Sequence, residues 1–229
     1  MNSNEQPLSD PTRVNCQIGS SWSLYDSYLA NESKTKSNYD DTLNLIFRFS
    51  TLSEFAMLWK YTNYSKPSSI FYDSVEQNQR YFKSCEDDKY EKSLDGIILF
   101  KNGIEPKWEH PQNHFGCHHE CNLVDINSEE TDQIWHNLVF ALVGETFPFM
   151  QYINGVRFLD RVKKFKSIKI EVWISVGFKS IREESEEHMK HALIIDSIEA
   201  KLAEIINRTI NFPQSSINRK EHYILNKVN

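Results

Sequence analysis

Apolar residues alternate with polar ones over several short stretches of the chain, a pattern that is typical of half-buried β-strands. Other short stretches are almost wholly apolar, as expected for strands covered on both faces. Strands are predicted at 43–49, 94–101, 118–126, 155–165 and 168–176, with a last one within 207–229. The strands at 155–165 and 168–176 are close enough in sequence to form a hairpin.

Helical spacing of apolar residues appears in three other stretches. Two of them begin with a capping box, in which a pair of side chains satisfies free backbone N–H groups at the helix start. The boxes are Thr51 with Glu54 and Asn127 with Glu130, and a third helix is predicted over 182–206. Because the strands cluster between helices without strict alternation, the pattern predicts an α+β fold.

A single domain is predicted over residues 21–229. Residues 1–20 are polar and aperiodic, which predicts a disordered tail, with ordered structure beginning near Trp22. Residues 65–93 show no stable period, so they form either a disordered insertion or a functional loop.

Composition limits the classes of function. The 229 residues are 39% apolar, enough for a sizeable core, and the net charge of −6 argues against a broadly basic nucleic-acid coat protein. The net charge does not exclude a local basic pocket for a phosphorylated ligand. No apolar run reaches the ~18 residues of a membrane span. The N-terminus lacks a secretory signal, and the four cysteines do not resemble a disulfide framework. We therefore expect a soluble monomer of the cytoplasm or nucleus, with no membrane partner.

The predicted hairpin carries the most chemistry. Lys169, Glu171 and Trp173 share one face of its second strand, so Trp173 either lines a ligand cavity or is merely half-buried under a loop. From 157 to 169 the chain holds six Lys or Arg and one acid. This basic segment is either a solvated hairpin or a phosphate clamp that makes charge-assisted hydrogen bonds.

Two earlier features add candidates. Trp108 lies beside Glu109 in a turn-rich segment, and an aromatic face next to an acid can bind a planar cation; the alternative is an ordinary core tryptophan. Six His and Cys residues fall within 110–121, but their spacing matches no common zinc pattern. Within a strand, His118 would face away from its neighbours on either side. No nucleotide-binding or hydrolase motif occurs, so no metal, no other cofactor and no enzyme activity are expected.

Four segments stand out for their order and spacing: NGIEPKWE at 102–109, WHNLVFALVGETF at 135–147, RVK at 161–163 and KIEVW at 169–173. Together they resemble the eukaryotic translation initiation factor 4E family, whose members bind the 7-methylguanosine cap of messenger RNA. The resemblance implies a curved antiparallel sheet of about eight strands with three helices on its convex face.

The resemblance also implies two functional surfaces. In the cap-binding site, the stacking pair is Tyr39 and Trp108, the guanine-reading acid is Glu109, the phosphate-binding pair is Arg161 and Lys163, and the residue that touches the methyl group is Trp173. On the convex face, the surface for a scaffold initiation factor or a repressor peptide includes Leu52, Phe140 and Val143.

Three positions depart from the family pattern. Ala56 replaces a tryptophan that grips the partner peptide, Tyr39 stands where many members have Trp, and His118 replaces a basic residue near the phosphates. The resemblance predicts capped mRNA as ligand and a role in translation initiation. The departures keep open a repressor or paralogue that binds the cap without recruiting the usual scaffold factor. A metal-dependent nucleotide hydrolase built on the His/Cys cluster is the alternative from another class.

Overall fold

In the described part of the chain, the strands form one antiparallel sheet of eight, ordered β2-β1-β4-β6-β7-β5-β8, with β3 paired to β4. The computed structural model describes residues 16–29, 42–71, 81–83, 91–161, 167–178 and 181–222. The strands are β1 (Gln17–Leu29), β2 (Leu43–Thr51), β3 (Tyr81–Lys83), β4 (Glu91–Lys101), β5 (Cys117–Val124), β6 (Ile153–Arg161), β7 (Ser167–Ile174) and β8 (Asn218–Glu221).

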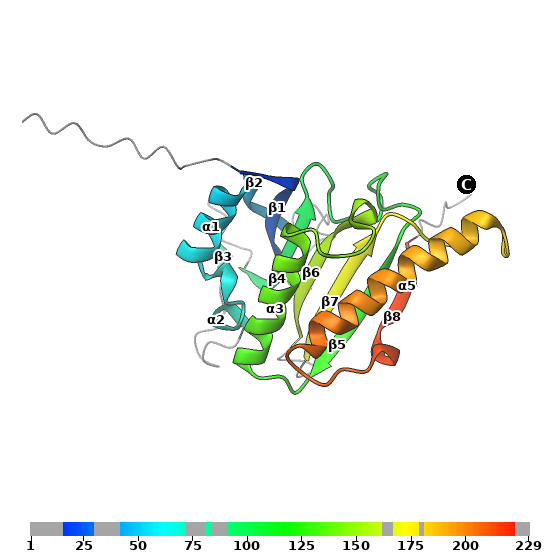
Figure 1. Ribbon diagram of the computed structural model, residues 1–229. Coiled ribbons are helices and arrows are strands. Elements are labelled where there is room, and N and C mark those ends of the chain that lie inside the picture. Colours follow the sequence, from blue (N-terminus) through cyan, green and yellow to red (C-terminus); the bar gives the residue numbers. More distant parts are fainter. Residues whose placement is uncertain are drawn as a thin grey trace, which may run out of the picture.

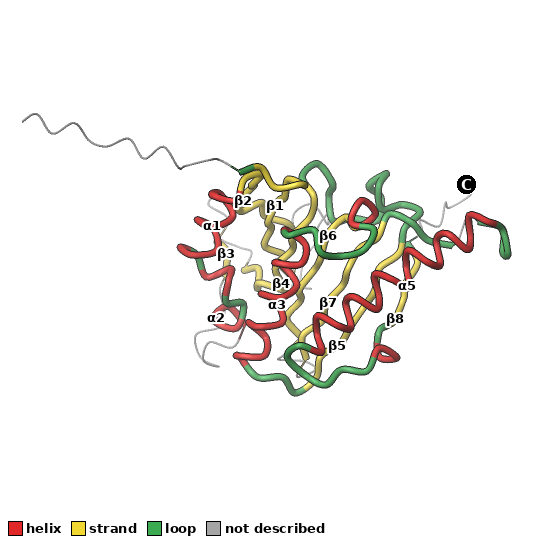
Figure 2. The backbone as a smooth tube through the Cα atoms, in the orientation of Figure 1, coloured by secondary structure: helices red, strands yellow, loops and turns green. Residues whose placement is uncertain are grey.

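Three long helices, α1 (Leu52–Tyr61), α3 (Ser128–Val143) and α5 (Glu186–Asn207), lie across the same face of the curved sheet (Figure 1). The other helical pieces are α2 (Ser68–Phe71) and the 3₁₀ turns η2 (Asn63–Ser65), η3 (Met150–Tyr152) and η4 (Gln214–Ser216). In Figure 2 the helices α3 and α5 cross in front of the strands. The predicted α+β fold, with about eight strands and three helices on one face, is confirmed. None of the helices described is long and apolar enough to cross a membrane.

The two faces of the sheet bury different sets of side chains. In β4, Ile97 and Leu99 point into the large core beneath the helices, whereas Ile98 and Phe100 point to the opposite face. Successive strand residues alternate in this way because the backbone is pleated. On the helix-free face, Ile98 and Phe100 form a small apolar cluster with Trp173. Because this apolar cluster is small, polar side chains can occupy the rest of this face.

Both predicted capping boxes are present. Thr51 Oγ1 accepts a hydrogen bond from the backbone of Glu54, and the Glu54 carboxylate accepts one from the backbone of Thr51. Asn127 and Glu130 make the same exchange at the start of α3. The third helix begins later than predicted. Ser185 caps it, and the preceding residue has a positive φ that a helix cannot contain.

The predicted tail through residue 20 is wrong at its end, because β1 begins at Gln17. Gln17 pairs with Thr51 of β2, and from Trp22 onward the strand pairs with both β2 and β4, so pairing with neighbours stabilises a strand whose first residues include few apolar ones. Further support comes from Cys16, whose carbonyl accepts from the backbone of Leu52 at 2.9 Å. Residues 1–15 lie outside the described residues.

The start of the predicted 65–93 insertion is packed. Ile70 and Phe71 of α2 are buried in the main core. The backbone and hydroxyl of Ser68 both donate to the Asp132 carboxylate, each at 2.8 Å. Sequence periodicity misses such a segment because one helical turn is too short to show a period. Residues 72–80 and 84–90 lie outside the described residues.

Candidate functional site

A cavity of about 390 Å³ opens on the helix-free face of the sheet. Its walls come from the segment after β4 and from four strands that are distant in sequence. The lining residues are Pro106, Lys107, Trp108 and Glu109, then His118 and Glu120 of β5, Arg157 of β6, Lys169, Glu171 and Trp173 of β7, and Lys220 of β8. The sheet thus gathers the predicted Trp108, Glu109 and Trp173 around one space.

The segment that carries Trp108 is held by one buried amide. Asn113 donates from its side chain to the carbonyl oxygens of Glu105 and Lys107, both at 2.8 Å, and accepts from the Asn154 amide. Trp108 itself is 43% exposed, so it is not an ordinary core tryptophan. Because the backbone just before Trp108 is held in place, its ring is presented at the cavity wall and stays partly exposed.

Trp173 forms a buried wall of the cavity. Its ring packs edge-on against Phe100, with centroids 5.5 Å apart, and the Arg157 guanidinium lies 5.8 Å from its centre. The indole N–H donates to Glu171 at 3.2 Å. Trp173 is therefore buried and also forms part of the cavity wall. The sequence left two alternatives for it, a cavity wall or a residue half-buried under a loop, and its position in the structure combines cavity lining with burial.

Charged side chains beside Trp173 form a closed network. Glu171 accepts from Arg157 at 2.9 Å and from Lys169 at 2.7 Å. Glu120 accepts from Lys169 at 2.7 Å and from Lys220 at 2.8 Å. Burial alone would raise the pKa of Glu171, but the charges of Arg157 and Lys169 outweigh it and hold that pKa at about 2. Both carboxylates are therefore ionised at neutral pH.

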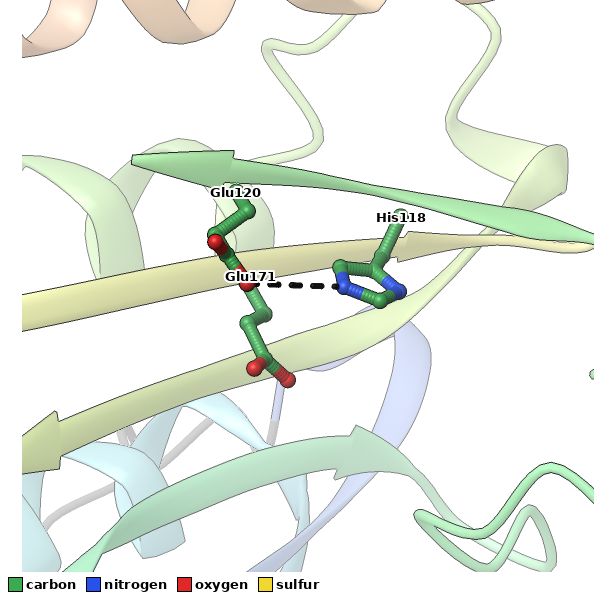
Figure 3. Close-up of side chains that lie close together, drawn as sticks. All are labelled: His118, Glu120 and Glu171. Atoms are coloured by element: carbon green, nitrogen blue, oxygen red, sulfur yellow. Dashed lines mark ion pairs between the residues drawn. The ribbon is translucent and has the colours of Figure 1, made fainter. Parts of the chain in front are cut away.

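His118 and Glu120 of β5 and Glu171 of β7 lie close together on these neighbouring strands (Figure 3), and their nearest ligand atoms are within 4.8 Å of one another. Such a triad could suggest a metal site. However, the ammonium groups of Lys169 and Lys220 already satisfy the carboxylates at hydrogen-bond distance. A divalent cation would have to displace them, so we interpret the triad as part of the ion-pair network.

The remaining His and Cys residues of β5 point to the other face. Cys117 and Cys121 belong to the core beneath the helices, and burial raises the pKa of both thiols. His119 contacts the carbonyl of Ile195 in α5 at 3.1 Å. The alternation predicted for this strand is confirmed, and the sheet itself separates the residues on which the hydrolase alternative depended.

A pair of histidines supports the cavity wall. His222 Nδ1 lies 2.9 Å from the carbonyl of Asn113, and because a carbonyl only accepts, this nitrogen carries the proton. His222 Nε2 then accepts from His118 Nδ1 at 2.8 Å. Burial lowers the pKa of both rings to about 4, so both are neutral at pH 7. His118 therefore offers its second nitrogen as an acceptor, unlike the basic residue that the resemblance places there.

Sequence reasoning missed His222. Its ring packs against Trp108 and Trp173, with centroids 5.7 and 4.4 Å away. It follows β8, whose pairing with β5 sets its place beside His118. No local pattern signals this, because the contact joins residues 104 positions apart.

The predicted phosphate-binding pair is only partly described. Arg161 forms an ion pair with Asp95 of β4 and is not among the described residues that line the cavity. Lys163 and the predicted stacking residue Tyr39 lie outside the described residues. Lys169, although placed on the face of Trp173 from the sequence, was not assigned a role, yet it lines the cavity with Arg157 and Lys220.

The convex face presents some of the predicted partner-binding residues to solvent. Leu52 and Phe140 are 52% and 43% exposed, whereas Val143 is buried. Ala56 is exposed in α1. One turn further on, the half-buried Trp59 packs edge-on against Phe140, with centroids 5.5 Å apart.

Fold and cavity together define an α+β protein with a lined cavity on the open face of a curved sheet. The family model described as eukaryotic initiation factor 4E matches residues 17–223. The chain therefore belongs to this family, and the resemblance seen in the sequence is confirmed.

Individual relatives are distant. Eukaryotic translation initiation factor 4E1 of Drosophila melanogaster is 28% identical over 156 residues, 68% of this chain and 49% of that protein. Factor 4E of Dictyostelium discoideum is 35% identical over 104 residues, 45% of this chain and 40% of that protein. The chain thus spans about half the length, or less, of these two relatives.

Solved structures show the same fold. Caenorhabditis elegans eIF4E-3 in complex with the 4E-binding protein Mextli superposes with a TM-score of 0.62 at 18% identity, covering 90% of this chain and 93% of that one. Ascaris suum eIF4E-3 with an m2,2,7G cap gives 0.61 at 19% identity, covering 91% and 92%. At this identity the likeness concerns the fold.

Proposed function

We propose that this protein binds the 7-methylguanosine cap of messenger RNA in the cavity beside Trp108 and acts as a non-enzymatic factor in translation initiation in the cytoplasm. The observation that carries the proposal is the pairing of an exposed aromatic ring, Trp108, with an adjacent acid, Glu109, on a cavity walled by Trp173. Membership of a family with cap-bound structures supports it.

The chemistry of the ligand explains this arrangement. Methylation at N7 gives the guanine ring a positive charge, so stacking on Trp108 gains cation–π energy of roughly 0.5–2 kcal/mol. Glu109 would accept two N–H groups from the guanine edge in a charge-assisted bidentate bond. In this proposal Tyr39 covers the other face of the base, Trp173 meets the methyl group, and Lys163 joins the phosphate contacts.

The convex face is the proposed partner surface. Leu52 and Phe140 offer exposed apolar area for the helix of a scaffold factor or a repressor, and Val143, which is buried, would add apolar character to the same surface. Ala56 leaves this surface without a large central side chain. That observation favours a second candidate function, in which the protein binds caps but recruits the usual scaffold poorly and so acts as a repressor or divergent paralogue.

Fluorescence titration tests cap binding directly. A 7-methylguanosine triphosphate should quench the tryptophan emission at much lower concentration than unmethylated GTP, because the latter lacks the ring charge. The matched variant Trp108→Ala should lose most of this difference, while its melting temperature stays near that of the natural protein, because Trp108 is exposed. Equal binding of the two nucleotides would contradict the proposal.

A further inference from the structure

Glu120 occupies an unusual place for an acid, because it lies on the cavity wall among the cations that a phosphorylated ligand would use. It sits in the middle of β5, between β7 and β8, and is only 6% exposed. One of its oxygens, Oε2, accepts from Lys169 of β7 at 2.7 Å and from Lys220 of β8 at 2.8 Å. A single carboxylate oxygen thus ties together ammonium groups from both neighbouring strands.

The other cations of the cavity are paired as well. Among the described lining residues, each Lys or Arg has a carboxylate within hydrogen-bond distance. The pairs are Lys107 with Glu105 at 2.7 Å, Arg157 with Glu171 at 2.9 Å, and Lys169 and Lys220 with Glu120. The network beside Trp173 therefore holds three positive and two negative groups, Arg157, Lys169 and Lys220 against Glu120 and Glu171.

His118 does not add to this charge. Burial keeps its ring neutral, Nδ1 donates to His222, and Nε2 faces Glu120 at 4.0 Å. A phosphate that approaches Lys169 or Lys220 consequently meets ammonium groups that are already paired with carboxylates. It also meets the negative charge of Glu120 in a setting that water screens poorly.

We propose that Glu120 is a specificity-determining residue that limits the contribution of the phosphate chain, so that this protein binds its cap mainly through the methylated base. The proposal rests on the cap-binding function proposed above. Glu120 holds Lys169 and Lys220 in position but cancels part of their charge. The ligand class that fits best is therefore a 7-methylguanosine nucleotide whose affinity rises only weakly with the number of phosphates.

Glu120→Gln tests this with little change of shape, since the amide oxygen can still accept a hydrogen bond from a lysine. Calorimetry would compare the natural protein and the variant with 7-methylguanosine and its mono- and triphosphate. Removal of one nearby charge should raise the affinity for the triphosphate about tenfold. The affinity for the bare nucleoside should stay within about twofold, and the triphosphate affinity of the variant should fall more steeply with salt.

The matched control is Glu105→Gln, which removes an acid from an ion pair of the same length with Lys107. The Glu105 side chain is 57% exposed, so water screens its charge and the same substitution should change triphosphate affinity less than about twofold. A second variant, Lys220→Gln, lowers the charge of the network from its exposed side, where the Lys220 side chain is 53% exposed. It should weaken triphosphate binding about threefold and leave the nucleoside unaffected.

The possible results separate the role of Glu120 from the cap-binding function. A triphosphate-to-nucleoside affinity ratio that is unchanged or lower in Glu120→Gln would overturn the assignment. If that variant proves unfolded in a thermal melt, a loss of about tenfold or more in the triphosphate-to-nucleoside ratio of Lys220→Gln overturns it instead, because a lysine whose charge Glu120 offsets cannot contribute so much. Failure of the natural protein to bind even the methylated nucleoside would refute the cap-binding function, which is a separate outcome.

Discussion

The two faces of the sheet present different kinds of surface. On the helix-free face, the cavity beside Trp108 is lined by polar groups that are bonded to one another. They include two ionised carboxylates and a pair of neutral histidines. On the convex face, Leu52, Met57 and Phe140 are between 43% and 53% exposed. The first surface suits a small charged ligand held in a fixed geometry, and the second suits an apolar helix.

The largest effect is expected from the acid at the cavity rim. Glu109→Ala should abolish cap binding, because the guanine edge loses its bidentate acceptor at a cost of about 2–4 kcal/mol. Binding of a partner peptide to the convex face should not change. Calorimetry with both ligands measures this, and a variant that keeps its natural affinity for the cap would remove Glu109 from the site.

The convex face should respond to the opposite kind of change. Ala56 is exposed one helical turn from Leu52 and from Trp59. Ala56→Trp should strengthen the contact with a family-type partner peptide by about 2 kcal/mol, roughly 30-fold, because a tryptophan at an interface centre buries much more area than alanine. Cap affinity should stay the same. Tight peptide binding by the natural protein would show that Trp59 or another residue already fills the place, and would remove the main support for a repressor.

These two surfaces also differ in how far the sequence predicts them. The convex face follows from local rules, because the capping boxes and apolar periods of α1 and α3 are contained in short segments. Trp108 and Glu109 stand out as an aromatic residue beside an acid in a turn-rich segment, and Trp173 follows from strand alternation; the resemblance then gives all three a role. Such signals depend on neighbours in the chain, and the structure bears out the elements that carry them.

The ion-pair network and the histidine pair could not be predicted in the same way. Glu120 meets Lys220, and His118 meets His222, only because β5 pairs with β8 across about a hundred residues. β1 was missed for a related reason, since its stability comes from pairing with two strands and not from its own apolar content. Register between distant strands is set by the whole sheet, and no short pattern records it.

Acid should destabilise the protein through the helix-free face. His118 and His222 have pKa values of about 4 when folded, against about 6.5 in an unfolded chain. Between these values the unfolded state binds protons that the folded state does not, so stability should fall as pH drops from 6.5 towards 4. Between pH 6.5 and pH 5.5 this pair should lose about 2 kcal/mol of stability. The ionisation of Glu171 contributes only at lower pH, because its pKa is about 2.

Urea unfolding at several pH values measures this loss. His222→Phe keeps a ring between Trp108 and Trp173 but removes one titrating group, so its stability should depend less on pH between 6.5 and 4.5. The control His136→Phe changes a half-buried histidine of the convex face and should leave most of the slope. The buried His119, on the core side, supplies a background that all variants share. Equal slopes in the natural protein and His222→Phe would contradict the neutral pair.

The smallest effect concerns which cation meets the phosphates. Lys169 lines the cavity, whereas Arg161 is paired with the buried Asp95. Lys169→Ala should therefore weaken binding of the triphosphate relative to the nucleoside by about 1 kcal/mol, a modest change because Glu120 and Glu171 already offset its charge. Arg161→Ala should mainly lower the melting temperature, since it leaves Asp95 buried without its partner. Arg161→Ala could instead weaken triphosphate binding more than Lys169→Ala does. The ion pair between Arg161 and Asp95 would then have to open when the ligand binds. In that case the family resemblance would identify the phosphate contact better than the unliganded geometry does.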